Sequence, residues 1–141
     1  MDFQTNRQTS QAELPPAPRC TLVIFGATGD LTGRLLVPAL YNLARLKALH
    51  PEFRVIGIGH RALDDEGFRR RLKEAADQVF ASRGEEAQAS FEAPVWKWLM
   101  GRTSYLQGDF EEERTYADLS QALAAEPGGV IFYFATAPGY F

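Results

Sequence analysis

The strongest constraint on this chain is an apolar run at residues 21–25 that leads directly into a glycine-spaced turn and then a helical pattern. The turn reads Gly26-Ala27-Thr28-Gly29-Asp30-Leu31-Thr32-Gly33. Its glycines let the backbone approach phosphate oxygens, and the following helix offers unpaired N–H groups and the positive end of its dipole to an anion. The pattern predicts a seat for the pyrophosphate of a nicotinamide or flavin nucleotide.

The glycine spacing by itself leaves an alternative open. It departs from the strict G-x-G-x-x-G pattern, so it also fits a tight strand-to-helix turn that binds nothing. The context favours the nucleotide, because a strand precedes the glycines and a helix follows them. The proposed pyrophosphate contacts are Gly26, Ala27, Thr28, Gly29, Asp30 and Leu31.

Four short β-rich runs, at residues 21–25, 53–58, 103–107 and 130–134, are almost continuously apolar, which is typical of parallel strands buried on both faces. Helical patterns lie between them, at residues 35–46, 68–79 and 116–123, with a further helix broken or begun near Pro94. This alternation predicts an α/β fold, a doubly wound, Rossmann-like parallel sheet of order 3-2-1-4. The sheet is expected to be truncated after its fourth strand, with an exposed edge there. Pro38 suggests a loose turn over residues 30–33 before the regular helix starts.

Composition narrows the class of protein and its partners. Residues 1–18 are polar and then proline-rich, which predicts a flexible leader before a partial dinucleotide-binding domain at residues 19–141 that lacks a substrate domain. No apolar run reaches the ~18 residues of a membrane span, and no secretory signal is visible. A net charge of −3 gives no reason to expect nucleic acid or an anionic membrane as partner. With a lone Cys20 and no metal-ligand spacing, we expect a cytoplasmic protein without a metal.

Residues after the second and third strands are candidates for the adenosine half of the nucleotide. His60 and Arg61 stand where an NAD-specific fold usually has a carboxylate, and a cation there suits the 2′-phosphate of NADP. A solvated turn is the alternative for both. Asp109 could accept a hydrogen bond from the adenine amino group, or it could cap the helix that follows.

Several blocks together carry a family resemblance: residues 25–32, 38–43, 55–57 and 131–138. In this order they resemble the amino-terminal cofactor domain of glucose-6-phosphate dehydrogenase. The resemblance implies oxidation of glucose 6-phosphate at C1 by NADP in the complete enzyme, within the pentose phosphate pathway. It also implies that Thr28 donates its hydroxyl to phosphate, and that Thr136 and Pro138 border the nicotinamide half. NAD is the alternative cofactor, and a homo-oligomer is compatible with the family.

Departures from the family pattern leave a second hypothesis open. His60 stands where the family usually has arginine, and Leu35 stands where relatives commonly carry an active-site lysine. The family's catalytic histidine and aspartate belong to segments beyond residue 141, so we assign no catalytic residue in this chain. The cluster Arg69, Arg70, Arg71 and Lys73 is interpreted as a solvated helix face. The alternative function is therefore a non-catalytic NADP-binding or redox-sensing module.

Overall fold

The computed structural model describes residues 17–109, 111–124 and 128–135. The strands of these residues form one parallel sheet in the order β3-β2-β1-β4. Their bounds are β1 (Cys20–Phe25), β2 (Arg54–Gly59), β3 (Thr103–Gln107) and β4 (Gly129–Phe134). The predicted fold class, strand positions and strand order are confirmed.

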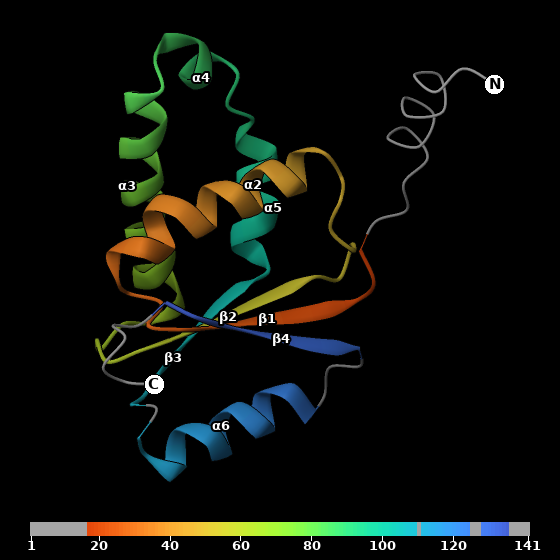
Figure 1. Cartoon of the computed structure of the whole chain (residues 1–141), viewed down its shortest axis with the longest axis vertical. Coiled ribbons are helices and arrows are strands. Elements are labelled where there is room, and N and C mark those ends of the chain that lie inside the picture. Colours follow the sequence, from red (N-terminus) through yellow and green to blue (C-terminus); the bar gives the residue numbers. More distant parts are fainter. Residues whose placement is uncertain (1–16, 110, 125–127, 136–141) are drawn as a thin grey trace, which may run out of the picture.

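Helices cover the two faces of the sheet unequally (Figure 1). One face carries the π-helical segment η1 (Thr32–Leu36), α2 (Val37–Arg45), α3 (Asp65–Ser82) and α5 (Ala93–Gly101), and the short α4 (Glu85–Ala89) lies at the far end of α3. The opposite face carries α6 (Glu113–Ala124). The carboxyl ends of all four strands meet at one edge, because the strands are parallel. That edge is where ligands bind in open α/β sheets.

The sheet separates two groups of core residues. Leu22 and Ile24 of β1 pack with the α2, α3 and α5 layer, whereas Val23 and Phe25 pack on the α6 side. This is the two-residue alternation of a strand buried on both faces. Trp96 of α5 is buried in the larger cluster and Trp98 packs against its border. They are core residues, as their apolar character suggests.

β4 is an exception to the prediction that every strand is buried on both faces. All six of its residues are exposed, and Ile131, Phe132 and Phe134 each keep about half of their surface accessible. The strand pairs with β1 only along one side, and among the described residues no further strand pairs with its other side. The predicted exposed edge is therefore present, and the apolar composition of a strand does not by itself guarantee cover.

The start of the first helix also differs from prediction. Instead of a loose turn over residues 30–33, the chain is helical from Asp30 and widens into η1, in which the Val37 N–H donates to the Thr32 carbonyl. Pro38 follows at the first turn of α2. Because proline has no N–H to donate and its ring crowds the carbonyl four residues back, a wider turn before it accommodates the missing bond without ending the helix.

The remaining elements follow the sequence closely. The helix predicted near Pro94 is two helices, and Pro94 lies in the first turn of α5. Most of the predicted leader, residues 1–16, lies outside the described residues; Ala17 donates its N–H to the Ala48 carbonyl at 2.8 Å. None of the described helices is both long and apolar enough to cross a membrane.

Candidate nucleotide-binding site

The glycine turn is closed by backbone hydrogen bonds to the end of β2. Gly26 has φ +79°, a left-handed conformation that favours glycine, and it turns the chain sharply after β1. The N–H groups of Gly26 and Ala27 both donate to the Ile58 carbonyl at 2.9 Å, and the Gly29 N–H donates to the Gly26 carbonyl at 3.0 Å. These three N–H groups serve the turn itself. The backbone N–H donors for an anion must therefore come from residues that follow the turn in the chain.

Such donors lie at the start of the helix that follows. Asp30 and Leu31 form its first turn, and N–H groups there have no intrahelical acceptor. The helix dipole adds a partial positive charge at the same place. The Asp30 carboxylate is turned to solvent, since it is 75 % exposed and lies 3.1 Å from Arg34 Nη1. The turn can therefore accept a phosphate at its backbone.

Thr28 reaches from the turn over the end of β2. A Cβ atom at Gly59 would lie only 2.9 Å from Thr28 Oγ1 and 2.9 Å from the Tyr105 hydroxyl. The glycine at the end of β2 thus leaves room for both side chains. Tyr105 in turn donates its hydroxyl to the Arg61 carbonyl at 2.7 Å, which fixes the segment after β2.

Burial raises the pKa of the Tyr105 phenol, while the positive charges of Arg61 and Arg71 oppose this rise. Arg61 itself is exposed, as the interpretation of a 2′-phosphate contact requires.

Arg71 is the residue that the sequence interpretation missed. Its Nε and Nη2 atoms donate to the Thr28 carbonyl at 3.2 and 2.9 Å, and the side chain is half-buried. Arg69 is held as well, by the Thr103 carbonyl at 2.9 Å, while Arg70 is exposed. The solvated helix face predicted for this cluster is therefore wrong for two of its arginines. Helical spacing could have indicated this, since Arg71 lies three residues after the buried Phe68 and so shares a face of α3 with it.

A cavity of about 240 Å³ lies beside the glycine turn. It is bounded by the turn on one side and by the middle of α3 on the other, and its lining includes Thr28, Gly29, Asp30, Gly33, Arg71 and Glu74. Gly33 allows η1 to approach α3 here, because a Cβ atom at this position would lie 2.5 Å from the Ala75 Cβ.

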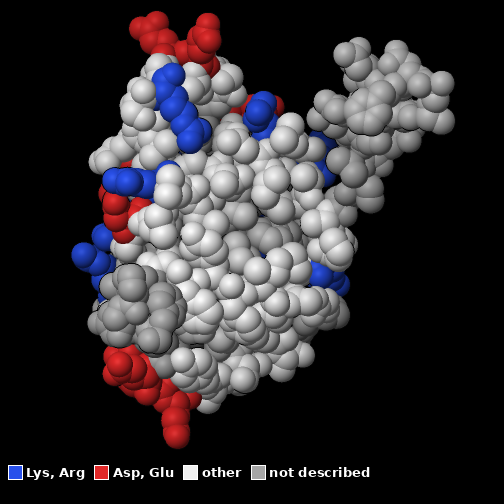
Figure 2. Space-filling view, in the orientation of Figure 1, with Lys and Arg blue, Asp and Glu red and all other residues white. Residues whose placement is uncertain are grey.

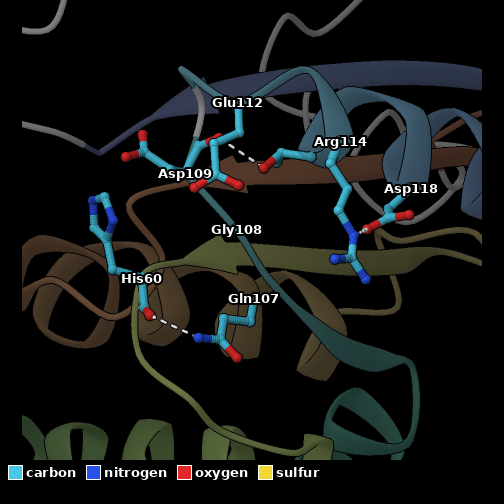
Figure 3. A pocket seen from close by; sticks show the side chains of 8 residues that line it. His60, Gln107, Gly108, Asp109, Glu112, Arg114 and Asp118 are labelled. Carbon is cyan, nitrogen blue, oxygen red and sulfur yellow. Dashed lines mark hydrogen bonds and ion pairs between the residues drawn. The ribbon is translucent and has the colours of Figure 1, made fainter.

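A second cavity, of about 380 Å³, lies at the ends of β2 and β3 (Figure 3). Its lining brings two predicted residues, His60 and Asp109, together with Gln107, Glu112, Arg114 and Asp118. The Gln107 amide donates to the His60 carbonyl at 3.3 Å. This cavity is rich in carboxylates and suits the amino and hydroxyl donors of an adenosine better than a phosphate.

Asp109 has a local role as well as a place in this cavity. Its Oδ1 accepts from the Glu111 N–H at 3.0 Å, and its carbonyl accepts from the Thr115 hydroxyl at 2.7 Å. The side chain thus organises the turn before α6, which was the alternative interpretation from the sequence. One carboxylate oxygen makes that bond, so the other can still face a ligand.

The last predicted contacts, Thr136 and Pro138, lie outside the described residues. The chain just before them runs beside the glycine turn: the Ala135 N–H donates to the Phe25 carbonyl at 2.8 Å. A Cβ atom at Gly29 would lie 3.8 Å from the Ala135 carbonyl oxygen. Leu35, at the position of the family lysine, is 57 % exposed on η1.

Comparison with known proteins agrees with this fold. The family model described as "Glucose-6-phosphate dehydrogenase, NAD binding domain" matches residues 23–141. The chain is similar to glucose-6-phosphate 1-dehydrogenase of Chlamydia muridarum, with 38 % identity over 134 residues that cover 91 % of this chain and 25 % of that protein. It is 33 % identical to the enzyme of Mycolicibacterium smegmatis over 131 residues, 89 % of this chain and 25 % of that protein.

Solved structures give the same result. The crystal structure of glucose-6-phosphate 1-dehydrogenase from Mycobacterium avium superposes with a TM-score of 0.73 and 29 % identity, covering 88 % of this chain and 25 % of that one. The chain thus spans about a quarter of the length of these relatives. The match assigns a nucleotide-binding domain of the NAD(P) type, so the resemblance seen in the sequence is confirmed. The chain belongs to the family of glucose-6-phosphate dehydrogenase NAD-binding domains.

Proposed function

We propose that this chain provides the NADP-binding part of a glucose-6-phosphate dehydrogenase, which oxidises glucose 6-phosphate to 6-phosphogluconolactone in the cytoplasm, as a step of the pentose phosphate pathway. The observation that carries the proposal is the turn at Gly26. It is built on the end of β2, opens into a helix N-terminus, and lies within the segment that matches the family. Residues 19–141 are proposed as the cofactor domain and residues 1–18 as a leader.

The proposed cofactor contacts follow the chain along the carboxyl edge of the sheet. The pyrophosphate lies over residues 26–31, and the Thr28 hydroxyl donates to a phosphate oxygen. The 2′-phosphate lies past the end of β2, where His60 and Arg61 follow the strand. Asp109 accepts from the adenine amino group, while Thr136 and Pro138 border the nicotinamide.

The residues present fit this cofactor. The turn supplies backbone donors and a helix dipole, and the end of β2 is followed by the cation of Arg61 where NAD-specific folds have a carboxylate. When bound, NADP accepts the hydride that leaves C1 of the sugar. This chain's own residues bind and orient the cofactor. Among its described residues none is assigned as the base for the sugar hydroxyl.

A non-catalytic NADP-binding or redox-sensing module is the second candidate. Leu35 favours it, because an exposed leucine stands where the resemblance implies an active-site lysine. Leucine can neither hold a charge nor donate a hydrogen bond to a sugar phosphate. The exposed apolar edge of β4 supports self-association of the chain under either function.

Calorimetric titration of the folded chain with NADP and then with NAD tests the proposal, followed by a glucose 6-phosphate oxidation assay. We expect tighter binding of NADP. Arg61→Ala should weaken NADP binding by about ten- to a hundredfold and NAD binding far less, because a charge-assisted contact to the 2′-phosphate is lost. Absence of binding by a folded sample would show that the glycine turn is only structural. Turnover of glucose 6-phosphate by the chain would exclude the non-catalytic module.

A further inference from the structure

Arg71 places a second cation beside the glycine turn, and some of its N–H donors and one neighbouring hydroxyl have no hydrogen-bond partner among the described residues. A guanidinium has five N–H donors. Two of them serve the Thr28 carbonyl, so the others have no partner among the described residues. The Thr28 hydroxyl likewise has no hydrogen-bond partner there. Donors left open together beside a cavity are a site for an acceptor group.

The charge at this place is not neutralised by a carboxylate bound to Arg71. No ion pair within the described residues includes Arg71, and Asp30 of the same cavity is paired with Arg34. Glu74 also lines the cavity and is exposed to solvent, where its repulsion is screened. The backbone of Arg61 lies near, since its carbonyl accepts from the Tyr105 hydroxyl at 2.7 Å, and that hydroxyl and Thr28 Oγ1 both border the Cβ position of Gly59.

The cavity on the other side of the end of β2 carries mainly negative charge. His60 lines a cavity whose walls carry the carboxylates of Asp109, Glu112 and Asp118 and one guanidinium, that of Arg114, which pairs with Asp118 at 3.7 Å. The remaining carboxylates leave this lining net negative, which disfavours a phosphate dianion. On the face shown in Figure 2, acidic side chains gather at the lower end of the molecule, by α6, and at its upper end, by α4, and several basic side chains lie between them along the side where Figure 1 places α3. A phosphate at the end of β2 is therefore attracted toward α3.

We propose that Arg71 of α3, together with Arg61 and the Thr28 hydroxyl, binds the 2′-phosphate of NADP on the α3 side of the glycine turn. This inference rests on the proposed function. A liquid water occupies about 30 Å³, so a cavity of about 240 Å³ accommodates the five heavy atoms of a phosphate group. Arg71 compensates for the arginine that the family usually has where His60 stands.

Arg71→Gln tests the assignment, because glutamine keeps a donor for the Thr28 carbonyl but removes the charge. We expect NADP affinity of the full chain to fall by about ten- to a hundredfold, with NAD affinity changed by less than about threefold. The matched control is Arg70→Gln, the same charge change one residue away on an exposed side chain, which should leave the NADP-to-NAD ratio unchanged. Arg69→Gln is a second control, because it replaces another carbonyl-bound arginine of α3 by glutamine without removing the charge of Arg71 beside the turn.

The outcomes separate this inference from the proposed function. Equal losses for NADP and NAD in Arg71→Gln would show that Arg71 only positions the turn, and an unchanged NADP affinity would show no role; either overturns the inference and leaves the proposed function standing. Wild-type chain that binds neither nucleotide overturns both. If Arg71→Gln does not fold by circular dichroism, Arg71→Lys decides: it keeps the charge and loses the forked geometry. For Arg71→Lys, a loss of NADP affinity smaller than the one expected for Arg71→Gln, without a loss of NAD affinity, supports the inference. An equal loss of affinity for both nucleotides overturns it.

Discussion

Replacing Gly57 by alanine in the middle of β2 inserts one methyl group where the core has no room. Its Cβ would lie 2.5 Å from the Phe68 Cζ and 2.8 Å from the Ala27 Cβ. Carbon atoms in contact are usually about 3.5–4.0 Å apart, so these neighbours must move by roughly 1 Å. Phe68 is 0 % and Ala27 1 % exposed, so neither can move into solvent.

Two effects of opposite sign set the magnitude. Overpacking of a core costs about 1–3 kcal/mol, while replacing glycine in a strand by alanine returns about 0.5–1 kcal/mol of chain entropy. The buried ring makes the first effect larger, so we expect a net loss of about 1–2 kcal/mol in the free energy of unfolding. For a chain of 141 residues this corresponds to a Tm lower by roughly 3–8 °C.

Thermal and urea unfolding of the single variants measure this loss. Gly101→Ala is the matched control, because a Cβ at this helix end meets nothing within 4 Å. It gains the same entropy without the clash and should stabilise the protein by about 0.5–1 kcal/mol. Combining Gly57→Ala with Phe68→Leu should cost less than the sum of the two single changes, because the smaller side chain relieves the clash. A Gly57→Ala protein as stable as wild type would refute the reasoning.

Three further changes are expected to alter stability through hydrogen bonding. Burial holds the folded-state pKa of Tyr105 above its unfolded value, so the contribution of the neutral phenol to the free energy of unfolding is fully present below about pH 10 and is lost as the pH rises through the folded pKa. Tyr105→Phe should therefore reduce the loss of unfolding free energy between pH 8 and 11, measured by urea unfolding, and a loss as large as in wild type would contradict this. Tyr41→Phe removes the hydroxyl that accepts from the Glu92 N–H at 2.8 Å and should cost about 1–3 kcal/mol in chemical unfolding; a loss within error would mean that water replaces the bond. Asp64→Ala removes the cap that accepts from the Gly67 N–H at 2.7 Å, with an expected loss of about 0.5–2 kcal/mol that Asp64→Asn should largely restore.

The sequence was sufficient for the order of the strands because the signals for them are local and repeated. Each of the four runs is apolar over its whole length and is separated from the next by helical periodicity, and right-handed crossovers then leave few topologies. The glycine turn was equally visible. Gly26 adopts the left-handed conformation that its place between strand and helix requires.

The sequence alone failed where the outcome depends on elements far apart in the chain. Three consecutive arginines on a helix resemble a solvated face, and only the packing of α3 against the turn shows that Arg71 is bound to Thr28, 43 residues away. The exposed edge of β4 was predicted, but the exposure of its faces was missed for the same reason, since its apolar residues depend on neighbours outside the strand for cover. Pro38 predicted an interruption, yet a π-helical turn absorbed it.

The sequence by itself determined the α/β alternation, the strand order, the glycine turn and the family, because each rests on residues adjacent in the chain or at fixed short spacing. Only the tertiary structure decided which cations lie beside Thr28 and which carboxylates surround His60. It did so because parallel strands bring the ends of distant segments to one edge, where charge and shape are set by side chains that no local pattern relates to one another.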